Sequence, residues 1–241
     1  FAGISNVFNA WDNLDKIFAI NARVPQYILE IISGFDKSIK FFQASSCLIF
    51  GRDTSGLQNE NTPANPLYPY GIAKLYADNM VKEFRKTFDI FACSGIFYPH
   101  ESERRGDDFF TKKITTAVKN IKAGKQKMVK VGNLESSRDF GYAPDYMEAV
   151  YSIMQQNIPE DYVIGSGILI DTLTFIKKCF DYVGLGFSDY IEIDQRVYRK
   201  NDTGILKADI SKIKREIGWQ PTTDIDEIIK IMIDHQQMPD S

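Results

Sequence analysis

The stretch "PYGIAKLYADNMVKEFRKTF" at residues 69–88 lies between two short apolar runs, "SIKFFQA" at 38–44 and "IFACSGIFY" at 90–98. Its larger apolar side chains recur at helical spacing, at Ile72, Leu75, Tyr76, Met80 and Phe84. The flanking runs are short and rich in β-forming residues, as buried parallel strands are. Strand, helix and strand in this rhythm predict an α/β fold built on a parallel sheet. A third strand is expected in "DYVIGSG" at 161–167.

Further helices are expected on both sides of this unit. Residues 13–33 predict one long helix despite Pro25, and residues 111–124 predict another that Gly124 ends. After a short strand in "KMVKVGN", three more helical patterns follow, in "LTFIKKCFDYVG", "DISKIKREIGW" and "DIDEIIKIMIDHQQ". Asp224 is placed to cap the last of these. This layout favours a smaller mixed α/β lobe beside the sheet.

Composition and charge are those of an ordinary globular chain of 241 residues, with 44% hydrophobic and 25% charged residues. The net charge of −3 does not favour a nucleic acid or an acidic membrane as partner, so an anionic ligand has to be met by local Arg and Lys. Its three cysteines, Cys47, Cys93 and Cys179, are far apart and form no metal-ligand spacing. We therefore expect reduced thiols, a cytoplasmic location, no metal site and no membrane span.

Tyr70 and Lys74 lie four residues apart on the predicted helix and project from one face. An ammonium beside a phenol lowers the pKa of the phenol, which suits Tyr70 to move a proton while a hydride moves to a nicotinamide. Ser46 ends an apolar strand, where α/β sheets place their ligand crevice, and its hydroxyl could hold the reacting oxygen. The alternatives are a solvated helix face for the Tyr–Lys pair and a turn or capping role for Ser46.

Several long segments of the chain resemble one family. Ser46, Tyr70 and Lys74 occur in the order of the catalytic triad of extended short-chain dehydrogenases that act on nucleotide sugars. "ACSGIFYPHESERRGDDFFTKKITTAVKNI" at 92–121 and "VGNLESSRDFGYAPDYMEAVYSIMQQNIPEDYVIGSG" at 131–167 are similar to the corresponding segments of GDP-mannose 4,6-dehydratases. "IDQRVYR" and "ADISKIKREIGWQP" continue the similarity toward the C-terminus. It covers almost the whole chain.

The resemblance implies a role for each matching position. Ser46 falls on a catalytic threonine and still supplies a hydroxyl, while Tyr70 and Lys74 fall on the catalytic tyrosine and the cofactor-binding lysine. His100 and Arg105 fall on contacts to NADP. Three cationic residues, Lys112, Arg138 and Arg199, are expected to bind the substrate, which is GDP-mannose or a related GDP-sugar. The alternatives are surface salt bridges for the arginines and a structural histidine at His100.

The same resemblance implies the domain organisation. Residues 1–98 and 141–165 are expected to form a partial Rossmann nucleotide-binding domain, and residues 99–140 and 166–241 a substrate-binding lobe. The sequence lacks a Gly-rich dinucleotide fingerprint, so the expected Rossmann-like parallel sheet lacks its N-terminal strands. A sheet cut there exposes a strand edge, which another copy or a different subunit could cover.

One departure from the family bears directly on the reaction. The family has a glutamate two residues after the catalytic hydroxyl, where this chain has Leu48. Loss of water from the sugar needs a base at C5, and leucine cannot accept a proton. Glu101 and Asp108 are candidate substitutes. The overall resemblance implies NADP-dependent dehydration to a 4-keto-6-deoxy sugar. Because of Leu48, two alternatives are kept: a C4 reductase or epimerase, and a catalytically impaired paralogue that acts as a structural or regulatory subunit.

Overall fold

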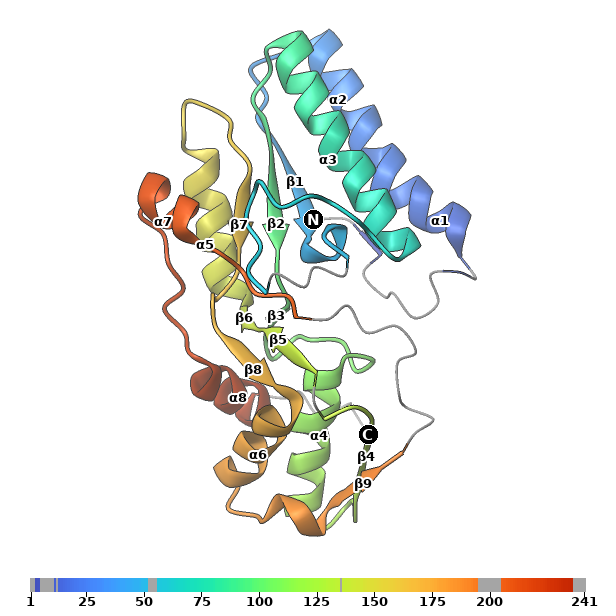
Figure 1. The fold of residues 1–241 in the computed structure, drawn as a ribbon, viewed down its shortest axis with the longest axis vertical. Coiled ribbons are helices and arrows are strands. Elements are labelled where there is room, and N and C mark those ends of the chain that lie inside the picture. The colour runs from blue at the N-terminus through green and yellow to red at the C-terminus, as the bar shows by residue number, and fades with distance from the viewer. Residues whose placement is uncertain are drawn as a thin grey trace.

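A three-stranded parallel sheet forms the upper half of the molecule (Figure 1). The computed structural model describes residues 3–4, 11, 13–51, 56–134, 136–194 and 205–235. The sheet has the order β1-β2-β7, with bounds Phe41–Ser46, Ala92–Phe97 and Tyr162–Ile164. The strands expected from the sequence are thus confirmed, each shorter than its apolar run.

The helix expected over residues 13–33 is interrupted by one wider turn. It consists of α1 (Leu14–Phe18), the π-helical turn η1 (Ala19–Arg23) and α2 (Val24–Phe35). The wide turn comes directly before Pro25, which lies at the start of α2. Proline has no N–H to donate to the carbonyl four residues back, so the regular hydrogen-bond ladder cannot continue through this point.

Helix α3 spans Pro69–Phe88, as the sequence predicts, but it buries a different face. Ile72 and Tyr76, expected on the apolar face, are 44% and 38% exposed. The buried side carries Ala73, Ala77 and Val81, all 0% exposed, together with polar side chains that meet the sheet. Small residues let a helix approach its partner closely, which places the larger apolar side chains at the flank of α3. There Tyr76 Oη donates to Gln26 Oε1 of α2 at 2.6 Å.

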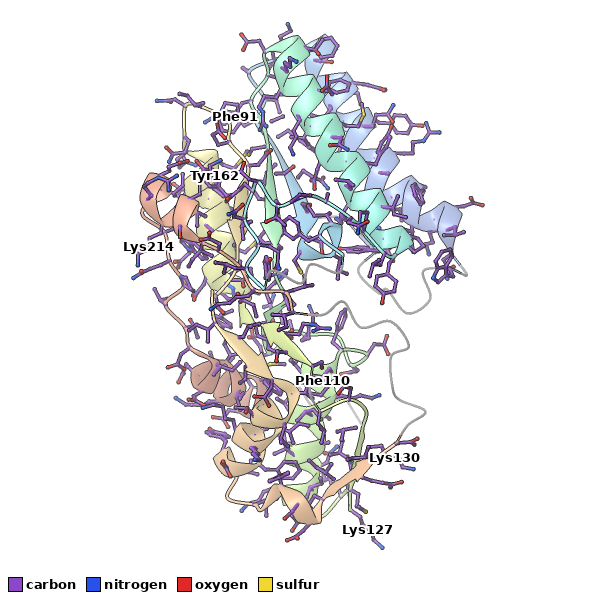
Figure 2. All side chains as sticks on the ribbon, in the orientation of Figure 1. Phe91, Phe110, Lys127, Lys130, Tyr162 and Lys214 are labelled. Carbon is purple, nitrogen blue, oxygen red and sulfur yellow. The ribbon has the colours of Figure 1, made fainter. Side chains whose placement is uncertain are left out.

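Helices α2 and α3 cover one face of the sheet, and α5 (Ala143–Met154) and α7 (Ser211–Ile217) cover the other (Figure 1). Side chains from both layers fill the space between helices and strands, as Figure 2 shows around Phe91 and Tyr162. The α5 side of the sheet is packed by a buried cluster of Cys93, Phe97, Tyr146, Ala149, Ile153, Tyr162, Ile164, Ile213 and Trp219.

The lower half consists of three short ladders and three helices. The ladders pair β3 (His100–Glu101) with β6 (Gly141–Tyr142), β4 (Val129–Val131) with β9 (Ile191–Ile193), and β5 (Ser137–Asp139) with β8 (Leu169–Asp171). The helices are α4 (Phe110–Lys122), α6 (Thr172–Tyr182) and α8 (Ile225–Asp234). Two 3₁₀ turns, η2 (Cys47–Ile49) and η3 (Phe187–Asp189), complete the described elements. Asp224 caps α8 by accepting from Glu227 N at 2.9 Å, as expected. In the part of the chain that the structure describes, no helix has the length and apolarity of a membrane span.

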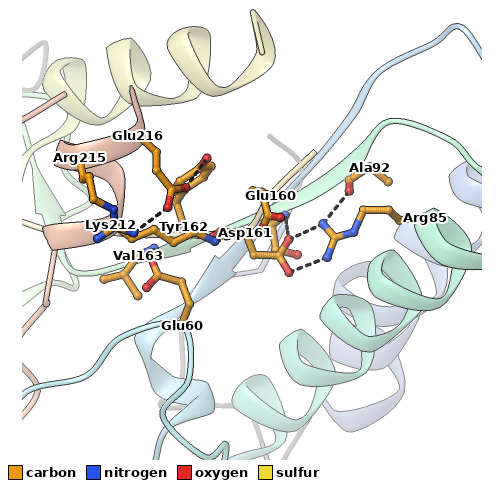
Figure 3. A network of polar contacts seen from close by, with 11 residues as sticks. Glu60, Arg85, Ala92, Glu160, Asp161, Tyr162, Val163, Lys212, Arg215 and Glu216 are labelled. Carbon is orange, nitrogen blue, oxygen red and sulfur yellow. Dashed lines mark hydrogen bonds and ion pairs between the residues drawn. The ribbon is translucent and has the colours of Figure 1, made fainter. Parts of the chain in front are cut away.

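A polar network joins α3, the sheet and α7 at the start of β7 (Figure 3). Asp161 accepts two hydrogen bonds from Arg85 of α3, at 3.0 and 3.1 Å, and one from Ser94 N at 2.7 Å. On the other side, Lys212 of α7 donates to Glu160 and to the Asp161 carbonyl, each at 2.9 Å. Arg85 and Asp161 are 22% and 12% exposed in their side chains, so this is a largely buried pair.

Replacing Arg85 with leucine should lower the free energy of unfolding by about 2 kcal/mol, because Asp161 would keep a buried charge without its cation. Urea denaturation of the two proteins measures the difference. Lys86→Leu is the control, because Lys86 lies next to Arg85 on α3 and is exposed. An Arg85→Leu protein as stable as this control would contradict the assignment.

Candidate active site

Ser46 is the last residue of β1, and its hydroxyl faces the start of α3. Its Oγ accepts from Leu48 N at 3.3 Å, which makes Ser46 the cap of η2. The Ser46 side chain also lies close enough to Tyr70 to lower the pKa of its phenol. The capping role and the proposed active-site role therefore coexist in one side chain. The position, at the carboxyl end of a parallel strand, is where α/β sheets place ligands.

Tyr70 reaches Ser46 because α3 begins very close to η2. Pro69 occupies the first turn of α3, where its missing N–H costs no hydrogen bond. Gly71 follows Tyr70, and a Cβ at this position would lie 2.6 Å from the Leu48 carbonyl oxygen. The Tyr–Gly pair thus lets the helix start against the turn that carries Ser46.

The pKa of Tyr70 is shifted in the direction opposite to the one that the sequence predicts. Burial raises the pKa of Tyr70 to about 12, and the hydrogen bond with Ser46 opposes this shift only in part. The prediction was wrong because it weighed a neighbouring cation but not the loss of water around a side chain that is 9% exposed. At neutral pH, the protein by itself therefore holds Tyr70 as a neutral phenol.

Lys74 lies one turn further along α3 and is 6% exposed. Its Nζ donates to the Ala44 carbonyl of β1 at 2.8 Å and lies 5.6 Å from the centre of the Tyr70 ring. Burial lowers the pKa of Lys74, and the negative charge of Asp78 opposes that shift. The structure therefore brings Ser46, Tyr70 and Lys74 together, with the ammonium anchored on the strand beside the phenol.

Asn21 joins this group, although nothing in the sequence analysis singled it out. It lies on η1, is 1% exposed, and pairs with both backbone groups of Ile4 at 3.2 Å. A Cβ at Gly3 would lie 3.1 Å from Asn21 Oδ1 and 3.7 Å from Lys74 Nζ. The chain at Gly3 thus passes beside the ammonium. A lone amide within an apolar helical pattern is the signal that could have indicated it.

His100 is held by the protein on several sides. Its ring packs against Phe97 and Tyr146, each with centroids 5.3 Å away. Nδ1 lies 2.9 Å from the Tyr98 carbonyl; because a carbonyl only accepts, Nδ1 carries the proton and Nε2 is the acceptor. Burial lowers the pKa of His100, and the Arg105 guanidinium lowers it further. A neutral imidazole follows.

Arg105 has contacts on three sides. Its Nε lies 3.2 Å from Glu101 Oε2, its Nη1 donates to the His100 carbonyl at 3.3 Å, and its guanidinium stacks 3.6 Å from the centre of the Phe109 ring. These contacts order the loop between β3 and α4. They bring the two residues predicted to contact the cofactor into one segment.

The cationic residues predicted to bind substrate have different environments. Lys112 is 8% exposed, and its Nζ donates to the Glu103 carbonyl at 2.9 Å. Arg138 of β5 donates to the Ser137 carbonyl at 2.7 Å. Its guanidinium lies near Cys47, whose thiol pKa rises to about 12 through burial while Arg138 opposes the rise. Arg138 is thus placed toward the end of β1, and Arg199 lies outside the described residues.

Leu48 and the two carboxylates that could supply a base in its place, Glu101 and Asp108, lie in different environments. Leu48 packs against a buried apolar cluster of Cys47, Ile49, Phe50, Ile96, Tyr98, Val163, Leu206 and Ala208. Glu101 is 1% exposed and accepts from Thr111 Oγ1 at 2.6 Å besides its pair with Arg105. Asp108 is exposed on the loop before α4. Both contacts of Glu101 are made through Oε2 and hold its own loop.

Two further carboxylates, Asp139 and Asp145, hold the frame of the site. Asp139 accepts from the backbone N–H groups of Ser166, Gly167 and Ala208. Asp145 accepts from the backbone N–H groups of Thr222 and Thr223. Each carboxylate thereby fixes a distant segment of chain to the strand or helix next to the site.

Replacing Arg105 with methionine should raise the pKa of His100, because a cation that disfavours imidazolium is removed. The chain has two histidines, so the ring signals of His100 are easily followed in a pH titration by NMR. Arg104→Met is the matched control, since the Arg104 side chain is 90% exposed. A His100 midpoint that falls, or does not move, would disprove the contact.

Comparison with known proteins identifies the family of the chain. The model of the family described as GDP-mannose 4,6 dehydratase matches residues 1–232. GDP-mannose 4,6 dehydratase 2 of Arabidopsis thaliana is 40% identical over 198 residues, which are 82% of this chain and 53% of that protein. The human GDP-mannose 4,6 dehydratase is 35% identical over 217 residues, covering 83% of this chain and 58% of the relative. The chain thus spans somewhat more than half the length of these curated relatives.

Solved structures share the fold at lower identity. RMD from Pseudomonas aeruginosa, solved with NADPH, has a TM-score of 0.88 at 19% identity, covering 98% of this chain and 79% of that one. UDP-glucuronic acid 4-epimerase from Bacillus cereus, solved with UDP-glucuronic acid and NAD, has a TM-score of 0.84 at 21% identity, covering 98% and 73%. The fold is that of these Rossmann-type enzymes, and the sequence matches show that the chain belongs to the GDP-mannose 4,6-dehydratase family.

Proposed function

We propose that this chain carries the hydride-transfer site of an NADP-dependent enzyme that acts at C4 of a nucleotide sugar. The observation that supports this most is the convergence of three side chains at the carboxyl end of β1: the buried Lys74 ammonium bonds the Ala44 carbonyl and lies 5.6 Å from the centre of the Tyr70 ring, and Ser46 ends the strand beside them. Nicotinamide cofactors in the solved structures of similar fold support the cofactor class. GDP-mannose, or a related GDP-sugar, is the substrate class proposed from the family.

The residues present fit the nicotinamide end of such a cofactor. A bound nicotinamide would supply or accept the hydride. Ser46 would hold the sugar hydroxyl, and Tyr70 would exchange the proton with it. A phenol with a pKa of about 12 is a proton donor at neutral pH, which suits reduction of a carbonyl. In the oxidative direction the same group must act as phenolate, and a cation nearby favours that form.

Other side chains would position the two ligands. We assign Lys74, His100 and Arg105 to the cofactor. The sugar nucleotide is assigned to Lys112, Arg138 and Arg199, because guanidinium groups bind phosphate oxygens in pairs. Lys112 and Arg105 would have to share or release their present protein contacts to do so.

Dehydration to a 4-keto-6-deoxy sugar is the second candidate, and family membership favours it. It requires a base near C5. Leu48 packs among apolar side chains and cannot supply one, and Glu101 is buried and held through Oε2 by Thr111 and Arg105. Oxidation and reduction at C4 need only Ser46, Tyr70 and Lys74. The site by itself therefore supports C4 reduction or epimerisation better than elimination.

We further propose a cytoplasmic protein, because the three cysteines are free and buried. We also propose that it pairs with another copy or a related subunit through α2 and α3, whose exposed apolar side chains include Ile31, Phe35 and Ile72. A paralogue that serves only as such a subunit would bind no cofactor. Cofactor binding by the natural full-length protein therefore separates that alternative from the enzyme.

Replacing Tyr70 with phenylalanine should reduce hydride transfer about 10²- to 10⁴-fold while leaving NADPH binding within a few fold, because only the proton-exchanging hydroxyl is lost. Rates are measured by NADPH absorbance with a 4-keto sugar nucleotide, and binding by NADPH fluorescence. Tyr76→Phe is the control, since this hydroxyl bonds Gln26 on the outer side of α3. Absence of NADPH binding to the unsubstituted protein would overturn the proposal.

Replacing Leu48 with glutamate should produce or increase a product lighter by one water from GDP-mannose, because it supplies the missing base. Mass spectrometry of the product measures this. Leu48→Gln, of similar shape without the basic group, should not produce it. If the unsubstituted protein already forms that product as fast as Leu48→Glu does, another residue acts as the base and dehydration becomes the better description.

A further inference from the structure

A buried carboxyl, Asp78, lies directly beneath the candidate site. It belongs to α3, one turn after Lys74, and is 3% exposed. The Ser45 hydroxyl of β1 donates to Asp78 Oδ2 in a short contact, and the Ser94 hydroxyl of β2 donates to Oδ1 at 2.9 Å. Asp78 therefore connects α3 to two adjacent strands of the sheet at once.

The strand that Asp78 holds is the one that carries the site. Ser45 stands between Ala44, whose carbonyl accepts from Lys74, and Ser46, whose side chain lies beside Tyr70. Lys74 and Asp78 thus bind consecutive residues of β1 from consecutive turns of α3. Any change in the contact at Ser45 would move both the ammonium's acceptor and the reactive hydroxyl.

Two serine hydroxyls do not neutralise a buried carboxylate, and one carbonyl does not neutralise a buried ammonium. Burial raises the pKa of Asp78 to about 7, and the two serine hydrogen bonds oppose this shift. Burial lowers the pKa of Lys74, and the charge on Asp78 opposes it. The carboxylate of Asp78 therefore supports the charged form of Lys74 in a place with little water.

Other charged and titratable groups also act on the Asp78 carboxyl. From α3, the Lys82 ammonium lowers the pKa of Asp78, and Tyr70 lies within its electrostatic reach. From the segment before β7, the Asp161 carboxylate raises the pKa of Asp78, and Asp161 is itself paired with Arg85. Lys74 is the buried cation on the side of the active site.

We propose that Asp78 is a positioning residue for the active site: its carboxylate keeps Lys74 charged and holds β1 so that the Ala44 carbonyl and the Ser46 hydroxyl face α3. This inference rests on the proposed function for its importance to catalysis. The coupling between Asp78 and Lys74 is a property of the protein alone. It can be measured without cofactor or turnover, so its failure is distinguishable from failure of the proposed function.

The test is the titration of Lys74 in protein labelled with ¹³C at lysine Cε. The Lys74 signal is the one missing from Lys74→Met. Asp78→Asn removes the charge but keeps the size of the side chain, and it should lower the midpoint of Lys74 by about one pH unit. Glu83→Gln is the matched control, because Glu83 lies on the same helix, has the same charge and is exposed. It should leave the Lys74 midpoint unchanged.

A second measurement covers the case in which Asp78→Asn does not fold. Coupling between two sites is reciprocal, so Lys74→Met should raise the midpoint of the Asp78 carboxyl, followed by its ¹³C shift. A positioning role also predicts that Ser94→Ala, which keeps the charge and removes one hydrogen bond, leaves the Lys74 midpoint close to that of the unsubstituted protein. An equal Lys74 midpoint in Asp78→Asn and Glu83→Gln, or an unmoved Asp78 midpoint in Lys74→Met, would overturn the proposal.

Discussion

The buried ammonium of Lys74 is the constraint on which this site depends. A charge in this position is costly unless the protein supplies acceptors and an opposite charge. The Ala44 carbonyl supplies the acceptor, and Asp78, on the same helix, supplies the charge. The bonds of Lys74 to Ala44 and of Asp78 to Ser45 both require α3 and β1 to lie at one fixed distance. The same distance brings Tyr70 to Ser46, so one electrostatic requirement sets the geometry of the whole group.

Helix α3 is attached to the sheet by polar contacts along its length. Near its start Lys74 bonds the Ala44 carbonyl, in its middle Asp78 bonds Ser45 and Ser94, and near its end Arg85 pairs with Asp161. Between these contacts the interface is filled by alanine and valine. Small side chains allow close approach but define position weakly, whereas hydrogen bonds are directional. The polar contacts therefore determine where along the sheet the helix comes to lie.

The turn after Ser46 is where a change of chemistry would leave the fold intact. Leu48, where the resemblance places the family's glutamate, packs against an apolar cluster that extends to Leu206 and Ala208. Hydride transfer at C4 and loss of water share the same tyrosine and lysine, but elimination needs one more proton acceptor. A family fold with an intact triad is thus compatible with a reaction that stops at oxidation or reduction.

The sequence by itself determined the local elements and the family. The bounds of α3, the parallel strands and the cap of α8 follow from periodicity, proline and capping residues, which act within a few positions of the chain. The triad of Ser46, Tyr70 and Lys74 was also recognisable, because its order and spacing are carried by the sequence. Asp78 was visible as a residue four positions after Lys74, but a helix surface offers many such pairs.

Only the tertiary structure decided which face of α3 is buried, how burial shifts the pKa of Tyr70 and where the charge of Lys74 is balanced. These depend on β1, β2 and η1, segments separated from α3 in sequence, which remove water from its polar side chains. Desolvation is a property of the assembled layers and has no local signature. That is the physical reason why spacing predicted the participants in this site but gave the wrong direction for the ionisation of Tyr70.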